Sequence, residues 1–485
     1  MQRKFITNLG LLLLLNLLIK PFWVFGIDRT VQNVVGAEEF GFYYTILNFS
    51  FLFNILLDLG VTNFNNRNIA QNTQLLAKHF SGIVSLKLIL GFLYFIVTIG
   101  IGLLWGYRGS QLSLLALVGF NQFLLSFILY IRSNISGMLM FRTESFMSVL
   151  DRSLMIIIMA VLLWGHVISG EFQIEWFVYA QTSAYIIAAI IGYSVVVIKS
   201  KSLAINWNIP FFLMILRKSM PFALLTLLMT FYNRIDTVMI DKLLPNEIGN
   251  IQSGVYAHAY RILEATNQIS FLFAILLLPL FSHLIKAKES LINIVRVSFS
   301  LLFVATSILA ICTFFYSYEI MELLYDEHIS ESSSVYSVII FGVMAMGTSY
   351  IFGTLLTANG SLKELNTIAA ISLIISVTLN LVLVPKYHAF GSAVANLSAL
   401  SFSSIAQLYV VKSKFNFKID NNFIIRLFGF IIFTLIISYT STFVITYNWV
   451  LKLVFVSLSS LLIAVLMKLL SIKEFVEIIK NDQLK

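Results

Sequence analysis

The stretch that decides the fold occurs twice, as IDRTVQNVVGAEEFG (Ile27–Gly41) and as IDTVMIDKLLPNEIG (Ile235–Gly249). Both copies begin with Ile-Asp and end with Glu, an apolar residue and Gly, and they lie about two hundred positions apart. A repeat at this distance indicates a chain built from two related halves.

The composition shows in which solvent these halves fold. Hydrophobic residues make up 59% of the chain and charged residues only 11%, whereas a soluble domain carries about 25% charged residues. A helix of about 20 apolar residues spans the hydrocarbon core of a bilayer and satisfies its own backbone. We therefore expect an all-α, polytopic membrane protein. The single cysteine, Cys312, excludes disulfides within the chain and cysteine metal sites.

The chain contains fourteen apolar segments that predict transmembrane helices, with boundaries accurate to about two to four residues. These predicted spans cover residues 5–27, 40–62, 80–106, 111–131, 146–166, 174–198, 219–242, 254–280, 294–317, 334–357, 365–385, 389–411, 423–445 and 449–471.

The distribution of basic residues predicts the orientation, because positively charged loops remain in the cytoplasm. If both termini are cytoplasmic, only five of the 32 Lys and Arg residues lie in outer loops, namely Arg29, Arg108, Lys242, Lys386 and Lys452. Three more lie within spans, and all others are cytoplasmic. The net charge of +9 then reflects a basic cytoplasmic face suited to anionic lipids, and no nucleic-acid partner is expected.

The two copies of the repeat lie at the outer ends of the first and seventh predicted spans, so both halves have the same orientation. We expect two pseudo-symmetric lobes of six helices around a central cavity, as in many transporters. The predicted division is residues 1–205 for the N-lobe, 206–412 for the C-lobe with a cytoplasmic linker at its start, and 413–485 for the last two helices and a cytoplasmic tail.

Charged residues inside spans are candidates for function, because each costs about 2.5–3.5 kcal/mol at the helix centre. Three cations fall in the outer halves of their spans and could line one cavity, and Arg29 in the adjacent outer loop is a fourth candidate. A cluster of Arg and Lys suits a pyrophosphate anion. The candidate substrate-binding residues are therefore Lys20, Arg234, Arg261 and Arg29.

Three acidic residues, Asp58, Asp236 and Glu264, are candidates for coupling or for internal ion pairs. Glu264 follows Arg261 by three positions, so the two could neutralise each other on one helix face. Arg234 and Asp236 are two apart and do not face each other. Asp58 lies near the inner end of its span. Exposure at the membrane interface or capping of a helix could therefore explain its presence there without a role in coupling.

Several stretches resemble the bacterial polysaccharide repeat-unit flippases of the multidrug/oligosaccharidyl-lipid/polysaccharide exporter superfamily. They occur in a specific order along the chain: EEFGFYYTILNFSFLFNILLDLGV (38–61), NRIDTVMIDKLLPNEIGNIQSGVYAHAYRILE (233–264), LLLPLFSHL (276–284), LLTANGSLKELN (355–366) and LNLVLVPKYHAFGSAVAN (379–396).

This resemblance implies a flippase of the bacterial cytoplasmic membrane that moves a polyprenyl-pyrophosphate-linked oligosaccharide to the outer leaflet. Its partners would be membrane lipids and, as a candidate, the polysaccharide polymerase machinery. It implies neither catalysis nor a cofactor, and the sequence shows no metal-binding or nucleotide-binding motif. A lipid II flippase and a multidrug extruder are the alternatives. An extruder of cations would need unpaired acids in the first lobe, where this chain places Lys20.

Overall fold

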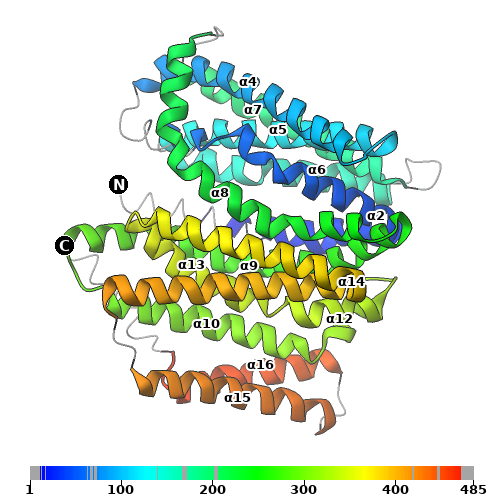
Figure 1. Cartoon of the computed structure of the whole chain (residues 1–485), viewed down its shortest axis with the longest axis vertical. Coiled ribbons are helices and arrows are strands. Elements are labelled where there is room, and N and C mark those ends of the chain that lie inside the picture. The colour runs from blue at the N-terminus through cyan, green and yellow to red at the C-terminus, as the bar shows by residue number, and fades with distance from the viewer. Residues whose placement is uncertain are drawn as a thin grey trace. The chain divides into compact units, whose positions relative to one another are not determined.

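The computed structural model describes residues 11–470 except 12, 13, 17, 63, 66–68, 70–73, 139, 166–171, 201–205, 418, 419 and 445–447. All regular structure in this part of the chain is helical (Figure 1), which confirms the predicted fold class. The chain forms two compact units, residues 1–254 and 255–485. The lobe boundary after residue 205 stays a prediction.

The first unit contains the elements from the π-helix η1 to the start of α9. In chain order they are η1 (Trp23–Asp28), α2 (Arg29–Leu52), the 3₁₀ helix η2 (Asn54–Leu57), α4 (Leu75–Leu104), α5 (Ser110–Gly137), α6 (Phe141–Trp164), α7 (Ile174–Ser200), α8 (Ile209–Leu243) and α9 (Asn246–Ala287). Helix α5 packs against α2, α4, α6 and α7, so it lies at the centre of this unit.

The second unit continues from α9. Its further helices are α10 (Ile292–Phe314), α11 (Ser317–Leu324), α12 (Ile329–Ile339), α13 (Gly342–Ala358), α14 (Leu362–Phe415), α15 (Asn421–Val444) and α16 (Trp449–Leu466). Helices α13 and α14 pack together, and α15 lies beside α16 (Figure 1).

Ten helices in the described part are long and apolar enough to cross a membrane. They cover eleven of the fourteen predicted spans, because α14 contains both 365–385 and 389–411. The other three predicted spans (5–27, 40–62 and 254–280) fall on segments that are mostly helical where the structure describes them. Turns interrupt 40–62 at residues 53 and 58–60, and residues 5–10, 12, 13 and 17 lie outside the described part. The count of fourteen spans stays a prediction.

Two helices contain sharp breaks. Gly36 (φ 80°, ψ 167°) divides α2, and His388 (φ 53°, ψ −134°), three residues after Pro385, divides α14. The break at His388 lies where the sequence predicts the connection between two spans. The break at Gly36 likewise lies within the predicted connection 28–39, but the first helix extends beyond its predicted end, because η1 continues into α2 and Arg29 is helical. The polar residues around Arg29 lower the local hydropathy but do not prevent helix formation, and Asp28 is buried and accepts a hydrogen bond from Gln32 Nε2.

Candidate functional site

Three basic side chains of the first unit form what we call the basic cluster: Lys20, Arg132 of α5 and Arg152 of α6. All three are half-buried. Lys20 interacts electrostatically with both arginines and, in the attractive sense, with Asp151. The structure thus places a predicted substrate-binding cation within electrostatic range of two further cations from different helices. Because Asn16, one turn before Lys20, donates to Ser148 Oγ at 2.9 Å, Lys20 lies near the predicted inner end of span 146–166, and its predicted position in the outer half of the membrane is wrong.

The two arginines of the basic cluster are held in different ways. Arg132 donates from both Nε and Nη2 to one oxygen of Glu144, Oε1, at 2.9 and 2.6 Å. Arg152 lies over the Trp23 ring at 5.4 Å and over the Tyr185 ring at 5.9 Å from the centroids. A planar guanidinium between two aromatic rings is a cation–π arrangement.

Two carboxylates of the described residues lie next to the basic cluster. The basic cluster contains three cations, whereas Glu144 and Asp151 supply two carboxylates, and Arg152 Nε lies 3.8 Å from Asp151 Oδ2. Arg152 also donates a hydrogen bond to the Tyr185 hydroxyl at 3.3 Å. The region therefore combines three basic side chains with the buried rings of Trp23 and Tyr185, and arginine and lysine are the side chains that bind phosphate groups.

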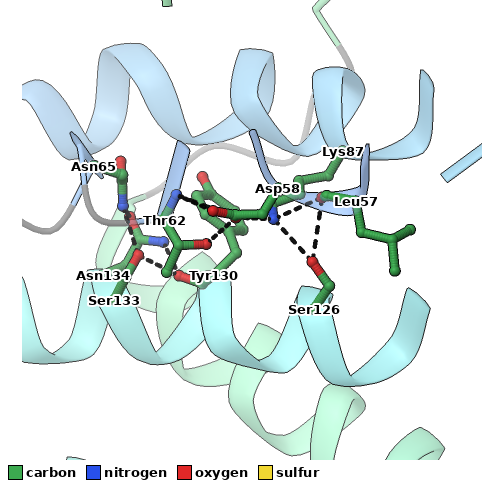
Figure 2. A network of polar contacts seen from close by, with 9 residues as sticks. All are labelled: Leu57, Asp58, Thr62, Asn65, Lys87, Ser126, Tyr130, Ser133 and Asn134. Atoms are coloured by element: carbon green, nitrogen blue, oxygen red, sulfur yellow. Dashed lines mark hydrogen bonds and ion pairs between the residues drawn. The ribbon is translucent and has the colours of Figure 1, made fainter. Parts of the chain in front are cut away.

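A second polar group lies where the second predicted span ends. Lys87 of α4 has 1% of its side chain exposed and forms an ion pair with Asp58. Its Nζ also donates to the Leu57 carbonyl at 3.0 Å and to Ser126 Oγ at 3.0 Å. Figure 2 shows the three acceptors around the ammonium group. All three of its N–H groups thus have acceptors.

Asp58 has a second contact besides this ion pair. Its carboxylate accepts hydrogen bonds from the Thr62 backbone N–H at 3.2 and 3.3 Å and from the Thr62 hydroxyl. These contacts span the left-handed residues Leu59 and Gly60 and tie the two sides of the turn together; they are not the contacts of a helix N-cap, which bonds the second or third residue of the helix. Asp58 is therefore held by an ion pair to Lys87, which the sequence did not predict, and by hydrogen bonds to Thr62 within its own turn.

A polar cluster continues from Thr62 along α5. Asn65 Nδ2 donates to Ser133 Oγ at 2.9 Å and to Asn134 Oδ1 at 3.1 Å. Asn134 Nδ2 in turn donates to the Tyr130 carbonyl at 2.8 Å (Figure 2). The segment from Leu57 to Asn65 is thus hydrogen-bonded to α5 at both of its ends, through Ser126 at Leu57 and through Ser133 and Asn134 at Asn65.

The remaining candidates have separate surroundings. In the first unit, Arg234 of α8 lies 4.9 Å from the centroid of the Phe51 ring and donates to Asn48 Oδ1 at 3.3 Å. Asp236 is buried, and Arg29 is half-buried at the start of α2. In the second unit, Arg261 Nη1 lies 3.3 Å from Glu264 Oε2, so the internal ion pair considered for these two residues is present. One shared cavity for Lys20, Arg234 and Arg261 stays a prediction.

Lys87, Arg132 and Arg152 are candidate functional-site residues that the sequence did not predict. Lys87 and Arg152 lie inside the predicted spans 80–106 and 146–166, but their closeness to the inner span ends led to their assignment to the cytoplasmic face. The rule that identified Lys20, that a charge within an apolar segment needs a reason, would have identified both. Arg132 lies at the very end of a predicted span and gives no such signal.

Comparison with known proteins places the chain in a family. It belongs to the polysaccharide biosynthesis protein family, whose sequence profile matches residues 7–285. No curated protein sequence matches the chain.

Solved structures share its fold at low sequence identity. The structure "Lipid II flippase MurJ, inward closed conformation" has a TM-score of 0.68 and 16% identity, covering 98% of this chain and 100% of that chain. A MOP superfamily transporter from Pyrococcus furiosus has a TM-score of 0.54 and 14% sequence identity, covering 84% of this chain and 93% of that chain. An inward-facing multidrug resistance MATE family transporter has a TM-score of 0.55 and 12% sequence identity, covering 85% of this chain and 98% of that chain. The protein is thus a multi-pass membrane protein with the fold of MurJ and of the MATE transporters.

Proposed function

We propose that this member of the polysaccharide biosynthesis protein family is a flippase for a polyprenyl-pyrophosphate-linked oligosaccharide. It would carry the repeat unit from the inner to the outer leaflet of the bacterial cytoplasmic membrane by alternating access, with both termini cytoplasmic. No covalent bond changes, so the protein would act as a transporter and not as an enzyme. Polysaccharide polymerase machinery would receive the product.

The observation that supports this proposal most strongly is the basic cluster. Lys20, Arg132 and Arg152 place three cations among helices that a membrane surrounds, where isolated charge is costly. A sugar pyrophosphate carries about two negative charges, and Arg binds phosphate oxygens in a bidentate manner. A transporter of cationic drugs would need excess negative charge in this region, so the cluster disfavours the multidrug extruder.

The direction of transport has a favourable electrical component. Moving negative charge outward across an inside-negative membrane releases about 2.3 kcal/mol per charge per 100 mV.

Lipid II carries the same pyrophosphate and the same type of lipid, so the basic cluster would suit both substrates equally. The lipid II flippase therefore remains the second candidate, supported by the fold it shares with MurJ.

The test is complementation of cells that lack this protein. Wild type, Lys20→Ala and Arg152→Ala are compared at matched membrane levels, and surface polysaccharide and cytoplasmic lipid-linked repeat units are quantified. We expect that wild type restores the polymer and that both variants leave repeat units on the cytoplasmic side. Full export by both variants would refute the role of the cluster, and cell lysis without a polysaccharide defect would indicate lipid II.

A further inference from the structure

The second predicted span is interrupted before it reaches its inner end. Helix α2 ends at Leu52 and the short helix η2 ends at Leu57. Leu59 (φ 45°) and Gly60 (φ 78°) then both adopt left-handed backbone conformations. We call residues 53–62 the hinge segment. Such an interruption leaves backbone carbonyls without helical partners, and lipid cannot supply donors.

Side chains from two neighbouring helices supply these donors. The Leu57 carbonyl accepts hydrogen bonds from Lys87 Nζ of α4 at 3.0 Å and from Ser126 Oγ of α5 at 3.2 Å (Figure 2). On another side, a Cβ at Gly60 would lie 2.6 Å from the Ser219 carbonyl oxygen of α8. The hinge segment is therefore in contact with three helices of the first unit.

Stability alone is a weak explanation for the buried ammonium group of Lys87. Replacing a buried ion pair by apolar side chains of similar size is often neutral or stabilising, because desolvation offsets the attraction of the charges. Lys87 is almost fully buried, with 1% of its side chain exposed, whereas Asp58 in the hinge segment has 27% exposed. The charge is thus built into the rigid helix α4, and its partner lies on the irregular segment.

We propose that Lys87 is a positioning residue that fixes the bend of the hinge segment during transport. The inference rests on the proposed transport function, since alternating access requires helices to change direction at defined points. Lys87 contacts the Leu57 carbonyl and the Asp58 carboxylate, the two groups immediately before the left-handed pair Leu59 and Gly60. It therefore sets the direction in which the inner end of the second span leaves the membrane, without touching the substrate.

The test compares the full-length protein with the double variant Lys87→Met/Asp58→Leu, which replaces the ion pair by apolar side chains. Three quantities are measured: the unfolding temperature, the amide hydrogen exchange of residues 53–62 in lipid nanodiscs, and polymer export in cells. We expect an unchanged or higher unfolding temperature, about tenfold faster exchange in the hinge segment but not in α5, and about tenfold lower export.

A matched control removes an ion pair elsewhere. Glu364 and Lys414 form an ion pair at the two ends of α14, with 34% and 35% of their side chains exposed. The variant Glu364→Leu/Lys414→Met should leave hinge exchange and export at wild-type values. If the Lys87→Met/Asp58→Leu variant does not reach the membrane, Ser126→Ala is the second variant to measure. It removes one acceptor of Lys87 and one donor to the Leu57 carbonyl, and should raise the amide hydrogen exchange of the hinge segment about threefold.

Two results overturn the proposal: wild-type hinge exchange in the variants, or wild-type export despite faster exchange. Failure of the wild-type protein itself to restore export would refute the proposed function instead. Hydrogen exchange of the hinge segment does not depend on the substrate, so it would still decide whether Lys87 fixes the bend.

Discussion

At the scale of single residues, the basic side chains inside the first unit differ in the groups that surround them. The Lys87 ammonium is enclosed by three acceptors, and its partner Asp58 keeps 27% of its side chain exposed. In the basic cluster, Arg132 has a carboxylate partner in Glu144, and Arg152 has two aromatic rings and the more distant Asp151. Lys87 therefore fits a role in the conformation of the chain, and the basic cluster fits a role in anion binding.

The two members of the Lys87–Asp58 pair should respond unequally to substitution. Removing one partner of a buried pair costs about 3–5 kcal/mol, because the other charge stays buried. Asp58→Asn leaves the charge of Lys87 in a fully buried place, whereas Lys87→Met leaves the partly exposed carboxylate of Asp58. Asp58→Asn should thus lower the unfolding temperature in detergent more than Lys87→Met does. The reverse order would show that the hydrogen bonds of Asp58 to Thr62, and not the ion pair, dominate.

Arg152→Lys tests whether the rings around the guanidinium matter. The substitution keeps the positive charge but loses the planar group that lies over Trp23 and Tyr185, at a cost of about 0.5–2 kcal/mol. We expect a severalfold reduction in export at unchanged membrane level. The control is Lys20→Arg, which keeps the charge and should retain most export. Equal export by wild type and Arg152→Lys would mean that only the charge is used.

At the scale of secondary-structure elements, the repeated stretch forms a close helix crossing in the first unit. A Cβ at Gly41 of α2 would lie 1.9 Å from the Asn250 carbonyl oxygen of α9, and one at Gly254 would lie 2.0 Å from the Ala37 carbonyl oxygen. The glycine that ends the first copy of the repeat is therefore needed for the approach of two backbones. This use of glycine is typical of helix contacts in membranes.

Gly41→Ala should accordingly separate α2 from the first turns of α9 and lower the unfolding temperature. Gly100→Ala is the matched control, because a Cβ there has no atom within 4 Å and alanine favours a helix by about 1 kcal/mol over glycine. Thermal unfolding of both purified variants distinguishes the outcomes. An unfolding temperature for Gly41→Ala at or above that of Gly100→Ala would show that the crossing adjusts without cost.

At the scale of the whole molecule, the sequence predicts the class of fold and much of the helix order. Apolar segments and the basic loops identify an all-α membrane protein, because both signals are local in sequence. The break at His388 also has a local signal in Pro385. The interruption at Leu59 and Gly60 was not predicted, because the apolar run 40–62 continues across it. The contacts of Lys87 with Asp58 and of Arg152 with Trp23 depend on which helices are neighbours, and one sequence does not contain that information.

The predicted orientation can be measured in the intact cell. Reporter fusions after residue 244, between α8 and α9, and after residue 416, between α14 and α15, should report the outer and the cytoplasmic side respectively, as the distribution of Lys and Arg predicts. Both fusions on the same side would contradict the predicted span count between them.

The central claim is that the basic cluster carries a lipid-linked sugar pyrophosphate across the membrane. The most direct measurement is translocation of a labelled polyprenyl-pyrophosphate oligosaccharide in vesicles that contain purified wild-type protein or the Lys20→Ala/Arg152→Ala variant. We expect wild-type vesicles to expose the sugar on the opposite leaflet, and the variant, at equal incorporation and with an unfolding temperature near that of wild type, to leave it in place. Equal translocation by both proteins would contradict the account.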